Sequence, residues 1–155
     1  ELTARPISLS QVAAEAAAAV RERHPKRDVR LEVAPGLEVN ADPRLLRIAL
    51  ENLLCNAWKY TARAPQPSVS VGMEAGEHGP VYFVRDNGVG FDSRRAGELF
   101  GVFKRLHSAK EFEGTGVGLA HAHRIIARHG GSMWGEAAVD RGATFYFGLR
   151  RARAN

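Results

Sequence analysis

Two spacings of apolar residues recur along this chain and divide it into helical and extended segments. Three stretches repeat apolar side chains every three or four positions, the spacing of an α-helix with one buried face. They are residues 10–23, 43–60 and 119–129. Shorter stretches are typical of β-strands, at residues 7–9, 29–33, 37–39, 68–73, 81–86, 132–136 and 144–149. The pattern predicts an α+β protein whose helices cover one face of a mixed sheet.

Residues with strong positional preferences mark where these segments begin and end. Ser8 or Ser10 can cap the first helix, and the pair Asp42-Pro43 supplies a cap and a first-turn proline for the second. The pair Gly130-Gly131 stops the third helix. Pro35-Gly36 stands between two of the strand segments and predicts a hairpin there.

Residues 87–116 contain many glycines and charges and only a short helix-like patch. An irregular stretch of this length inside a small domain usually has a functional role, so we interpret it as a functional loop.

Length and composition describe an ordinary globular protein with one hydrophobic core. The 155 residues are 45% hydrophobic and 25% charged, and we expect a single domain over residues 1–155. The single cysteine, Cys55, cannot form an internal disulfide, which suits a reducing compartment. No apolar run approaches the length of a bilayer-spanning helix, and no secretory signal is visible. The chain begins at Glu1 rather than Met, which suggests an excised fragment.

The net charge of +5 raises the question of an anionic partner, either nucleic acid or nucleotide phosphate. The positive residues concentrate in residues 21–30, 94–110 and 150–153, without regular aromatic interleaving and without a zinc-finger or RNA-recognition signature. We therefore expect no nucleic-acid partner.

The second predicted helix carries the first candidate for chemistry. Asn52, Asn56 and Lys59 share one face of it at 3.6 residues per turn. Beside them runs an apolar stripe formed by Leu46, Leu50, Leu53 and Ala57. Amide oxygens suit Mg²⁺, and a lysine can meet phosphate as a point charge. Taken alone, the spacing favours a solvated polar helix face, and the pattern gains weight only together with the next two segments.

Two glycine-rich segments carry the next candidates. Asp86-Asn87-Gly88-Val89-Gly90 follows a strand, where a carboxylate could accept a hydrogen bond from an exocyclic amine and glycines permit close backbone approach. By itself this segment is better interpreted as a turn, for which Asn-Gly is the usual choice. Gly114-Thr115-Gly116-Val117-Gly118-Leu119 opens a helix, where free amides can bind phosphate. It is neither a dinucleotide fingerprint nor a P-loop, because the spacing differs and no Gly-Lys-Ser/Thr follows.

These three segments, in this order, resemble the N, G1 and G2 boxes of the GHKL or Bergerat ATP-binding superfamily, which includes histidine kinases, DNA gyrase and heat-shock chaperone ATPases. Phe100 and Phe103 resemble the F box of the histidine kinase branch, and Gly142-Ala143-Thr144-Phe145 resembles the closing box. The lid segment 103–113 looks like that of phytochrome-type kinases. The resemblance extends from about Ile7 to Leu149 and implies a two-layer α/β sandwich, a mixed sheet of about five strands packed against three helices.

The resemblance also implies roles for individual residues around ATP and Mg²⁺. Asp86 would bind the adenine amine, Asn56 would coordinate Mg²⁺, and Asn52 and Lys59 would face the phosphates. Tyr60 and Thr144 would border the nucleotide. The phosphate-wrapping segment would comprise Gly114, Thr115, Gly116, Val117, Gly118 and Leu119, with Gly88 and Gly90 beside the base. On the lid, Lys104, Arg105 and His107 are candidates to neutralise charge on the γ-phosphate.

Asn52 favours a kinase over a hydrolase. The hydrolysing branch that this chain resembles has a glutamate base at that position, whereas an amide has no basic site near neutral pH. Two alternatives stay open at this point: a GHKL-type protein serine kinase, and an inactive nucleotide-binding or interaction module. The intact motifs argue against the inactive module.

None of the six histidines has the sequence setting of the family's phosphoacceptor. The resemblance therefore implies a chain that donates phosphate from ATP to a histidine on the separate dimerisation domain of the same kinase. A response regulator receiver domain would be an indirect partner. We expect a monomeric fragment in the bacterial cytoplasm, without membrane contact of its own, from a parent that is soluble or membrane-anchored.

Overall fold

The computed structural model describes residues 2–89, 115–137 and 142–149. Within these ranges there are three helices: α1 (Leu9–Arg23), α2 (Pro43–Tyr60) and α3 (Thr115–Arg128). The strands are β1 (Arg5–Ser8), β2 (Arg30–Val33), β3 (Glu38–Ala41), β4 (Ser68–Gly76), β5 (Gly79–Asp86), β6 (Ser132–Ala137) and β7 (Ala143–Gly148). No helix among the described residues is long and apolar enough to cross a membrane.

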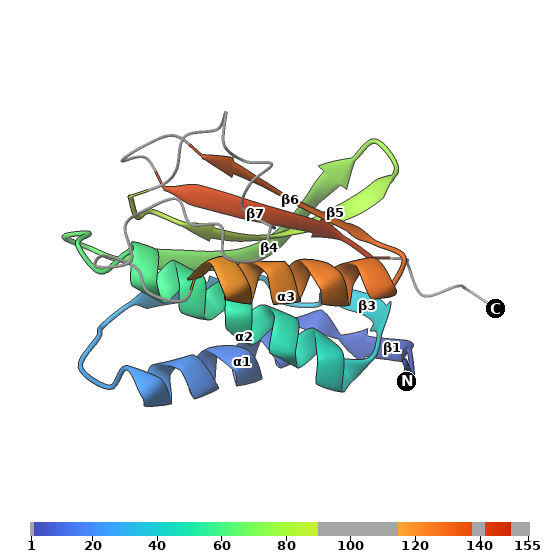
Figure 1. The fold of residues 1–155 in the computed structure, drawn as a ribbon, viewed down its shortest axis with the longest axis horizontal. Coiled ribbons are helices and arrows are strands. Elements are labelled where there is room, and N and C mark those ends of the chain that lie inside the picture. The colour runs from blue at the N-terminus through green and yellow to red at the C-terminus, as the bar shows by residue number, and fades with distance from the viewer. Residues whose placement is uncertain (1, 90–114, 138–141, 150–155) are drawn as a thin grey trace.

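The principal sheet has five strands in the order β2-β4-β5-β7-β6, and all three helices lie on one side of it (Figure 1). β2 pairs with β4 in parallel, and the other neighbours are antiparallel. β1 and β3 form a separate antiparallel pair. The mixed five-stranded sheet against three helices confirms the expected two-layer sandwich.

The predicted hairpin between β2 and β3 is wrong. The turn itself exists, with Gly36 at φ +72°, but the two strands on either side of it pair with different partners. The turn is instead attached to the start of α1, because the Ser10 hydroxyl donates to the Ala34 carbonyl at 2.6 Å and accepts from the Leu37 amide at 3.0 Å. These bonds direct the following strand towards β1.

The capping signals at the helix starts are confirmed for α1 and α2. The Ser8 hydroxyl accepts a hydrogen bond from the Gln11 amide at 3.1 Å. Asp42 Oδ1 accepts from the Arg44 amide at 3.0 Å, and Asp42 Oδ2 accepts from the Thr3 amide at 3.0 Å. α3 begins at Thr115, one turn before the predicted start at Leu119.

The core lies between the helices and the inner face of the sheet. Leu46, Leu50, Leu53 and Ala57, the predicted apolar stripe of α2, are at most 2% exposed. They belong to the same buried cluster as Val84, Phe145 and Phe147 of the sheet. Burying one leucine side chain stabilises a fold by about 1.5–3 kcal/mol, so the stripe fixes α2 on the sheet. The polar edge of α2 is thereby held in a set position.

His129, after the end of α3, joins that helix to the start of α2. Its Nε2 accepts a hydrogen bond from the Asp42 amide at 3.0 Å. Its Nδ1 donates to the Ile125 carbonyl at 2.8 Å, so the ring is the neutral tautomer that carries its proton on Nδ1. The side chain is 8% exposed, so His129 packs in the interior between these two helices.

Candidate nucleotide site

The polar edge of α2 presents Asn52, Asn56 and Lys59, as the spacing predicted. Asn56 is only 4% exposed, and neither its amide oxygen nor its amide nitrogen has a hydrogen-bond partner among the described residues. An unpaired buried amide costs roughly 1–3 kcal/mol, so its presence needs an explanation. A bound ligand that uses the amide oxygen would supply one.

The start of α3 lies directly beside Asn52. Asn52 Nδ2 donates to His121 Nδ1 at 3.4 Å. A Cβ placed on Gly118 would stand 3.7 Å from Asn52 Oδ1. Asn52 on α2 and the described start of α3 therefore lie side by side, and together they make the candidate site.

Asp86 ends β5 on the same side of the sheet as the helices. It is 5% exposed, and burial raises the pKa of its carboxyl to about 7, although hydrogen bonds from the Gly88 and Ala143 amides oppose that rise. The Gly88 amide donates to Asp86 Oδ1 at 2.8 Å. A buried carboxyl poised near neutral pH is typical of a functional group rather than a structural one.

The turn after Asp86 packs on the end of α2. The Val89 amide donates to the Tyr60 carbonyl at 3.2 Å, and a Cβ on Gly88 would stand 2.2 Å from that same oxygen. In the structure, glycine is required at position 88 because the Tyr60 backbone lies against it. The sequence had instead predicted that Gly88 allows close approach of a flat ring. Tyr60 is 1% exposed and brings α2 against this turn.

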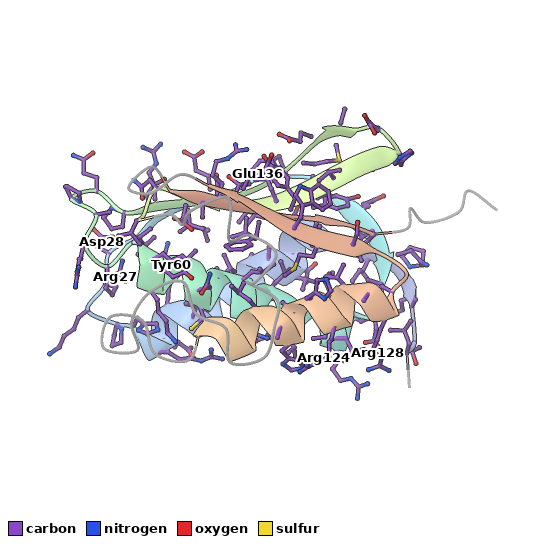
Figure 2. All side chains as sticks on the ribbon, turned by 45° about the horizontal axis from the view of Figure 1, so that its top comes forward. Arg27, Asp28, Tyr60, Arg124, Arg128 and Glu136 are labelled. Atoms are coloured by element: carbon purple, nitrogen blue, oxygen red, sulfur yellow. The ribbon has the colours of Figure 1, made fainter. Side chains whose placement is uncertain are left out.

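Arg27, whose sequence setting carries no signal of function, contacts the same end of α2. Its guanidinium donates to the Trp58 carbonyl and to the Thr61 hydroxyl, the latter at 3.1 Å. Figure 2 shows Arg27 and Tyr60 near one another at this end of the molecule. A cation is favourable at a helix C-terminus, and it satisfies carbonyls that the helix leaves open. A single arginine in a basic loop gave no pattern that could have predicted this contact.

Thr144 does not lie where the closing-box resemblance placed it. It is opposite Arg85 in the β5–β7 ladder, and its hydroxyl accepts a hydrogen bond from Arg85 Nε at 3.1 Å. Asp86 is opposite Ala143, on the helix side of the sheet. Thr144 shares the outer face with Glu136, its partner in β6, which Figure 2 shows on the side away from the helices. The prediction for Thr144 is therefore wrong in this geometry.

Gly142 is a second residue whose role emerges only in the structure. Its φ is +86°, and a Cβ there would stand 2.2 Å from the Asp86 carbonyl oxygen. Because only glycine tolerates both the conformation and the contact, Gly142 lets β7 begin directly against Asp86.

The remaining predicted residues fall into two groups. Gly90, Phe100, Phe103, Lys104, Arg105, His107 and Gly114 lie outside the described residues. Thr115 and Gly116 begin α3, followed by Val117. Leu119 is 1% exposed, and its side chain lies in the hydrophobic core rather than at the polar edge of α2.

A cavity of about 790 Å³ lies elsewhere in the molecule. It is lined by Gly76, Glu77, His78, Gly79, Pro80, Val81, Gly130, Gly131, Ser132, Trp134, Gly148 and Leu149. It sits at the Gly79 end of β5, whereas Asp86 is at the other end, about 23 Å away at strand spacing. Its two ionisable side chains, Glu77 and His78, are over nine-tenths exposed, so the cavity lacks a fixed group for phosphate or metal.

Residues 41–153 match a protein family described as "Histidine kinase-, DNA gyrase B-, and HSP90-like ATPase". The chain belongs to this family. The match spans α2, Asp86 and α3, the elements that build the site.

Within this family, the relatives and solved structures that the chain resembles are histidine kinases and a phytochrome-like protein. The chain is 33% identical over 141 residues to the phytochrome-like protein Cph1 of Synechocystis, covering 91% of this chain and 19% of that protein. It is 39% identical over 124 residues to the methanogenesis regulatory histidine kinase FilI of Methanothrix harundinacea, covering 79% of this chain and 14% of FilI. A structure of full-length ShkA in complex with AMPPNP superposes with a TM-score of 0.76 at 25% identity, covering 98% of this chain and 33% of that one.

These likenesses confirm a histidine kinase ATP-binding domain with the expected fold. The chain spans less than a fifth of the length of either of these two relatives. The signals that the whole relatives sense and the proteins that they phosphorylate therefore cannot be assigned to this chain from the likeness alone.

Proposed function

We propose that this domain binds Mg-ATP and donates the γ-phosphoryl group to a histidine on the dimerisation domain of the same kinase. A response regulator receiver domain would then take the phosphoryl group, within the cytoplasm of a bacterium. The observation that carries the proposal is the buried amide of Asn56, which has no partner among the described residues and lies one helical turn from Asn52, the residue that contacts α3.

The residues present fit a magnesium ion. The Asn56 amide oxygen is a hard ligand, and it is buried without another partner among the described residues. Asn56 would hold the metal, with Asn52 adjacent to it. When bound, Mg²⁺ neutralises charge on the β- and γ-phosphates and so favours transfer.

Asp86 would recognise the adenine amine. Its carboxylate is held at the end of β5 by the Gly88 amide, and burial limits competition from water. An ionised carboxylate accepts hydrogen bonds only, which selects an amine over a carbonyl at that position of the base.

The remaining groups would act on the phosphates. Lys59 would meet them as a point charge, and the amides of residues 114–118 would wrap them at the positive end of α3. Lys104, Arg105 and His107 would neutralise charge that develops on the γ-phosphate.

In the transfer itself, an imidazole nitrogen of the acceptor histidine forms a bond to the γ-phosphorus. The bond from that phosphorus to the β,γ-bridging oxygen breaks, and ADP leaves with the electron pair. The proton lost by the imidazole passes to a base outside this chain. Because Asn52 has no basic site, the domain has no group at that position to activate water, and ATP survives until the acceptor arrives.

The test is a calorimetric titration with a non-hydrolysable ATP analogue, with and without Mg²⁺, on the wild type and on Asp86→Asn. We expect Mg²⁺-dependent binding to the wild type and binding at least tenfold weaker to Asp86→Asn, because the amide presents a donor towards the adenine amine. Asp28→Asn, a change on the exposed loop after α1, serves as the control and should bind like the wild type.

Two results would contradict the proposal. Undetectable binding to the wild type would indicate an inactive module. Equal binding by wild type and Asp86→Asn would remove the adenine assignment.

A further inference from the structure

His121 forms a contact that no predicted role accounts for. It is an exposed residue of α3, three positions after Gly118, and its Nδ1 accepts a hydrogen bond from Asn52 Nδ2. Among the described side chains, Asn52 and His121 are thus joined across the boundary between α2 and α3, at the point where the candidate nucleotide site lies.

This bond determines which way the Asn52 amide faces. An amide has one donating end and one accepting end, and the donating end is committed to His121. The accepting end, Oδ1, is the atom that faces the Gly118 position, 3.7 Å from where a Cβ would stand there. Without a partner for Nδ2, the amide could turn over at little cost and present its NH₂ group instead.

We propose that His121 is a positioning residue that holds the Asn52 amide with its oxygen, rather than its NH₂ group, facing the Gly118 position in the candidate site. Asn52 and Asn56 are four residues apart, so their side chains are neighbours on one helix face. With its oxygen presented, Asn52 assists Asn56 in holding Mg²⁺ or its waters, and its NH₂ group is turned away from the phosphates. The inference rests on the proposed binding of Mg-ATP and refines the sequence-based role of Asn52, which placed it against the phosphates.

The contact is suited to this task because a histidine that accepts through Nδ1 carries its proton on Nε2 and cannot also donate to the amide through Nδ1. It therefore enforces one amide orientation. Groups that orient a metal ligand in this way commonly alter metal affinity when removed, although they do not touch the metal.

The experiment measures affinity for the same ATP analogue with and without Mg²⁺, in five variants. These are His121→Ala, His121→Asn, Asn52→Ala, the double variant of His121→Ala with Asn52→Ala, and the control Arg124→Ala. Arg124 is exposed, lies one turn further along α3 and is seen in Figure 2 on the side of the helix away from the sheet.

We expect His121→Ala to weaken Mg²⁺-dependent binding about three- to tenfold, the range for loss of one hydrogen bond, and to leave Mg²⁺-free binding unchanged. His121→Asn should keep most of the Mg²⁺-dependent affinity that His121→Ala loses, because the asparagine Oδ1 can occupy the place of the imidazole Nδ1. The double variant should bind no worse than Asn52→Ala, since the histidine acts only through the asparagine. Arg124→Ala should match the wild type.

A purely structural contact predicts other results. Equal affinity of His121→Ala and the wild type in Mg²⁺ would overturn the inference, as would additive losses in the double variant or equal losses with and without the metal. If the wild type itself does not bind the analogue, the proposed function fails and the inference fails with it. If the wild type binds and Asp86→Asn does not, the function stands, and the His121 variants decide the inference alone.

Discussion

At the scale of single residues, the site consists of polar groups that weaken the fold. Asp86 and Asn56 are 5% and 4% exposed. One has a pKa raised by burial, and the other has no hydrogen-bond partner among the described residues. Selection for stability alone would replace such groups with apolar ones. We therefore expect that both residues lower the stability of the fold and contribute to ligand binding.

The Asp86 carboxyl should make stability depend on pH in an unusual direction. Its folded pKa of about 7 lies above the usual value of 3.8, so the folded state binds more protons between those values. The free energy of unfolding contributed by this group therefore falls as pH rises from about 4 to about 7. Asp86→Asn should remove the slope and be more stable than the wild type by at most about 4 kcal/mol at pH 8.

Urea unfolding at each pH between 4 and 8 measures this difference. Asp42→Asn provides the opposite case, because hydrogen bonds, first of all from the Thr3 amide, lower the pKa of Asp42. Its stabilising contribution should be present at neutral pH and disappear as pH falls through the lowered pKa. Parallel curves for wild type and Asp86→Asn would show that the carboxyl is not buried in solution.

Asn56→Leu should separate folding from metal binding. Removing a buried amide without partners is expected to stabilise the fold by about 1–3 kcal/mol and to abolish the effect of Mg²⁺ on analogue binding. The matched control is Asn87→Leu. The Asn87 side chain accepts from the Ser68 amide at 2.9 Å and donates to the Gln66 carbonyl at 2.8 Å, so its loss should destabilise. Chemical denaturation and calorimetry measure the two effects, and destabilisation by Asn56→Leu would refute the assignment.

At the scale of helices and strands, local signals predicted the ends of the elements better than their partners. The caps at Ser8 and Asp42 were predictable because a side-chain oxygen and nearby amides suffice to form them. The partner of β2 was not, because pairing depends on distant residues, and the Ser10 hydroxyl redirects the chain at Leu37. The closing-box resemblance likewise located the segment of β7 but could not show that Thr144 lies opposite Arg85 on the outer face of the sheet.

Two glycines of the site should respond in opposite ways to the same substitution. Gly88→Ala places a Cβ 2.2 Å from the Tyr60 carbonyl, which must displace the turn or the end of α2 and should cost about 1–3 kcal/mol. Gly118→Ala meets only an ordinary contact at 3.7 Å from Asn52 and raises helix propensity. It should stabilise by about 0.5–1 kcal/mol. Thermal unfolding of both variants measures the contrast, and equal effects would refute the close approach at Gly88.

At the scale of the whole molecule, the candidate nucleotide site and the cavity lie at opposite ends of the sheet. At one end of β5 the turn after Asp86 packs on the end of α2, and the cavity of about 790 Å³ lies at the Gly79 end. This cavity and the candidate nucleotide site thus lie apart. Sequence motifs can nominate a ligand site because recognition depends on a few residue types at fixed spacing, whereas the shape of a cavity depends on the path of the whole chain.

The domain should bind ATP without hydrolysing it quickly when no acceptor histidine is present. In the proposed role the base and the nucleophile come from another domain, and Asn52 offers no base for water. The isolated chain should therefore bind radiolabelled Mg-ATP, release phosphate slowly and carry no label on its own histidines.

Adding a dimerisation domain that contains the acceptor histidine should produce acid-labile label on that domain, and Asp86→Asn should suppress it. The same domain with its histidine changed to glutamine is the control and should stay unlabelled. Rapid phosphate release by the chain alone, or stable label on the chain itself, would contradict the role of donor to a separate histidine.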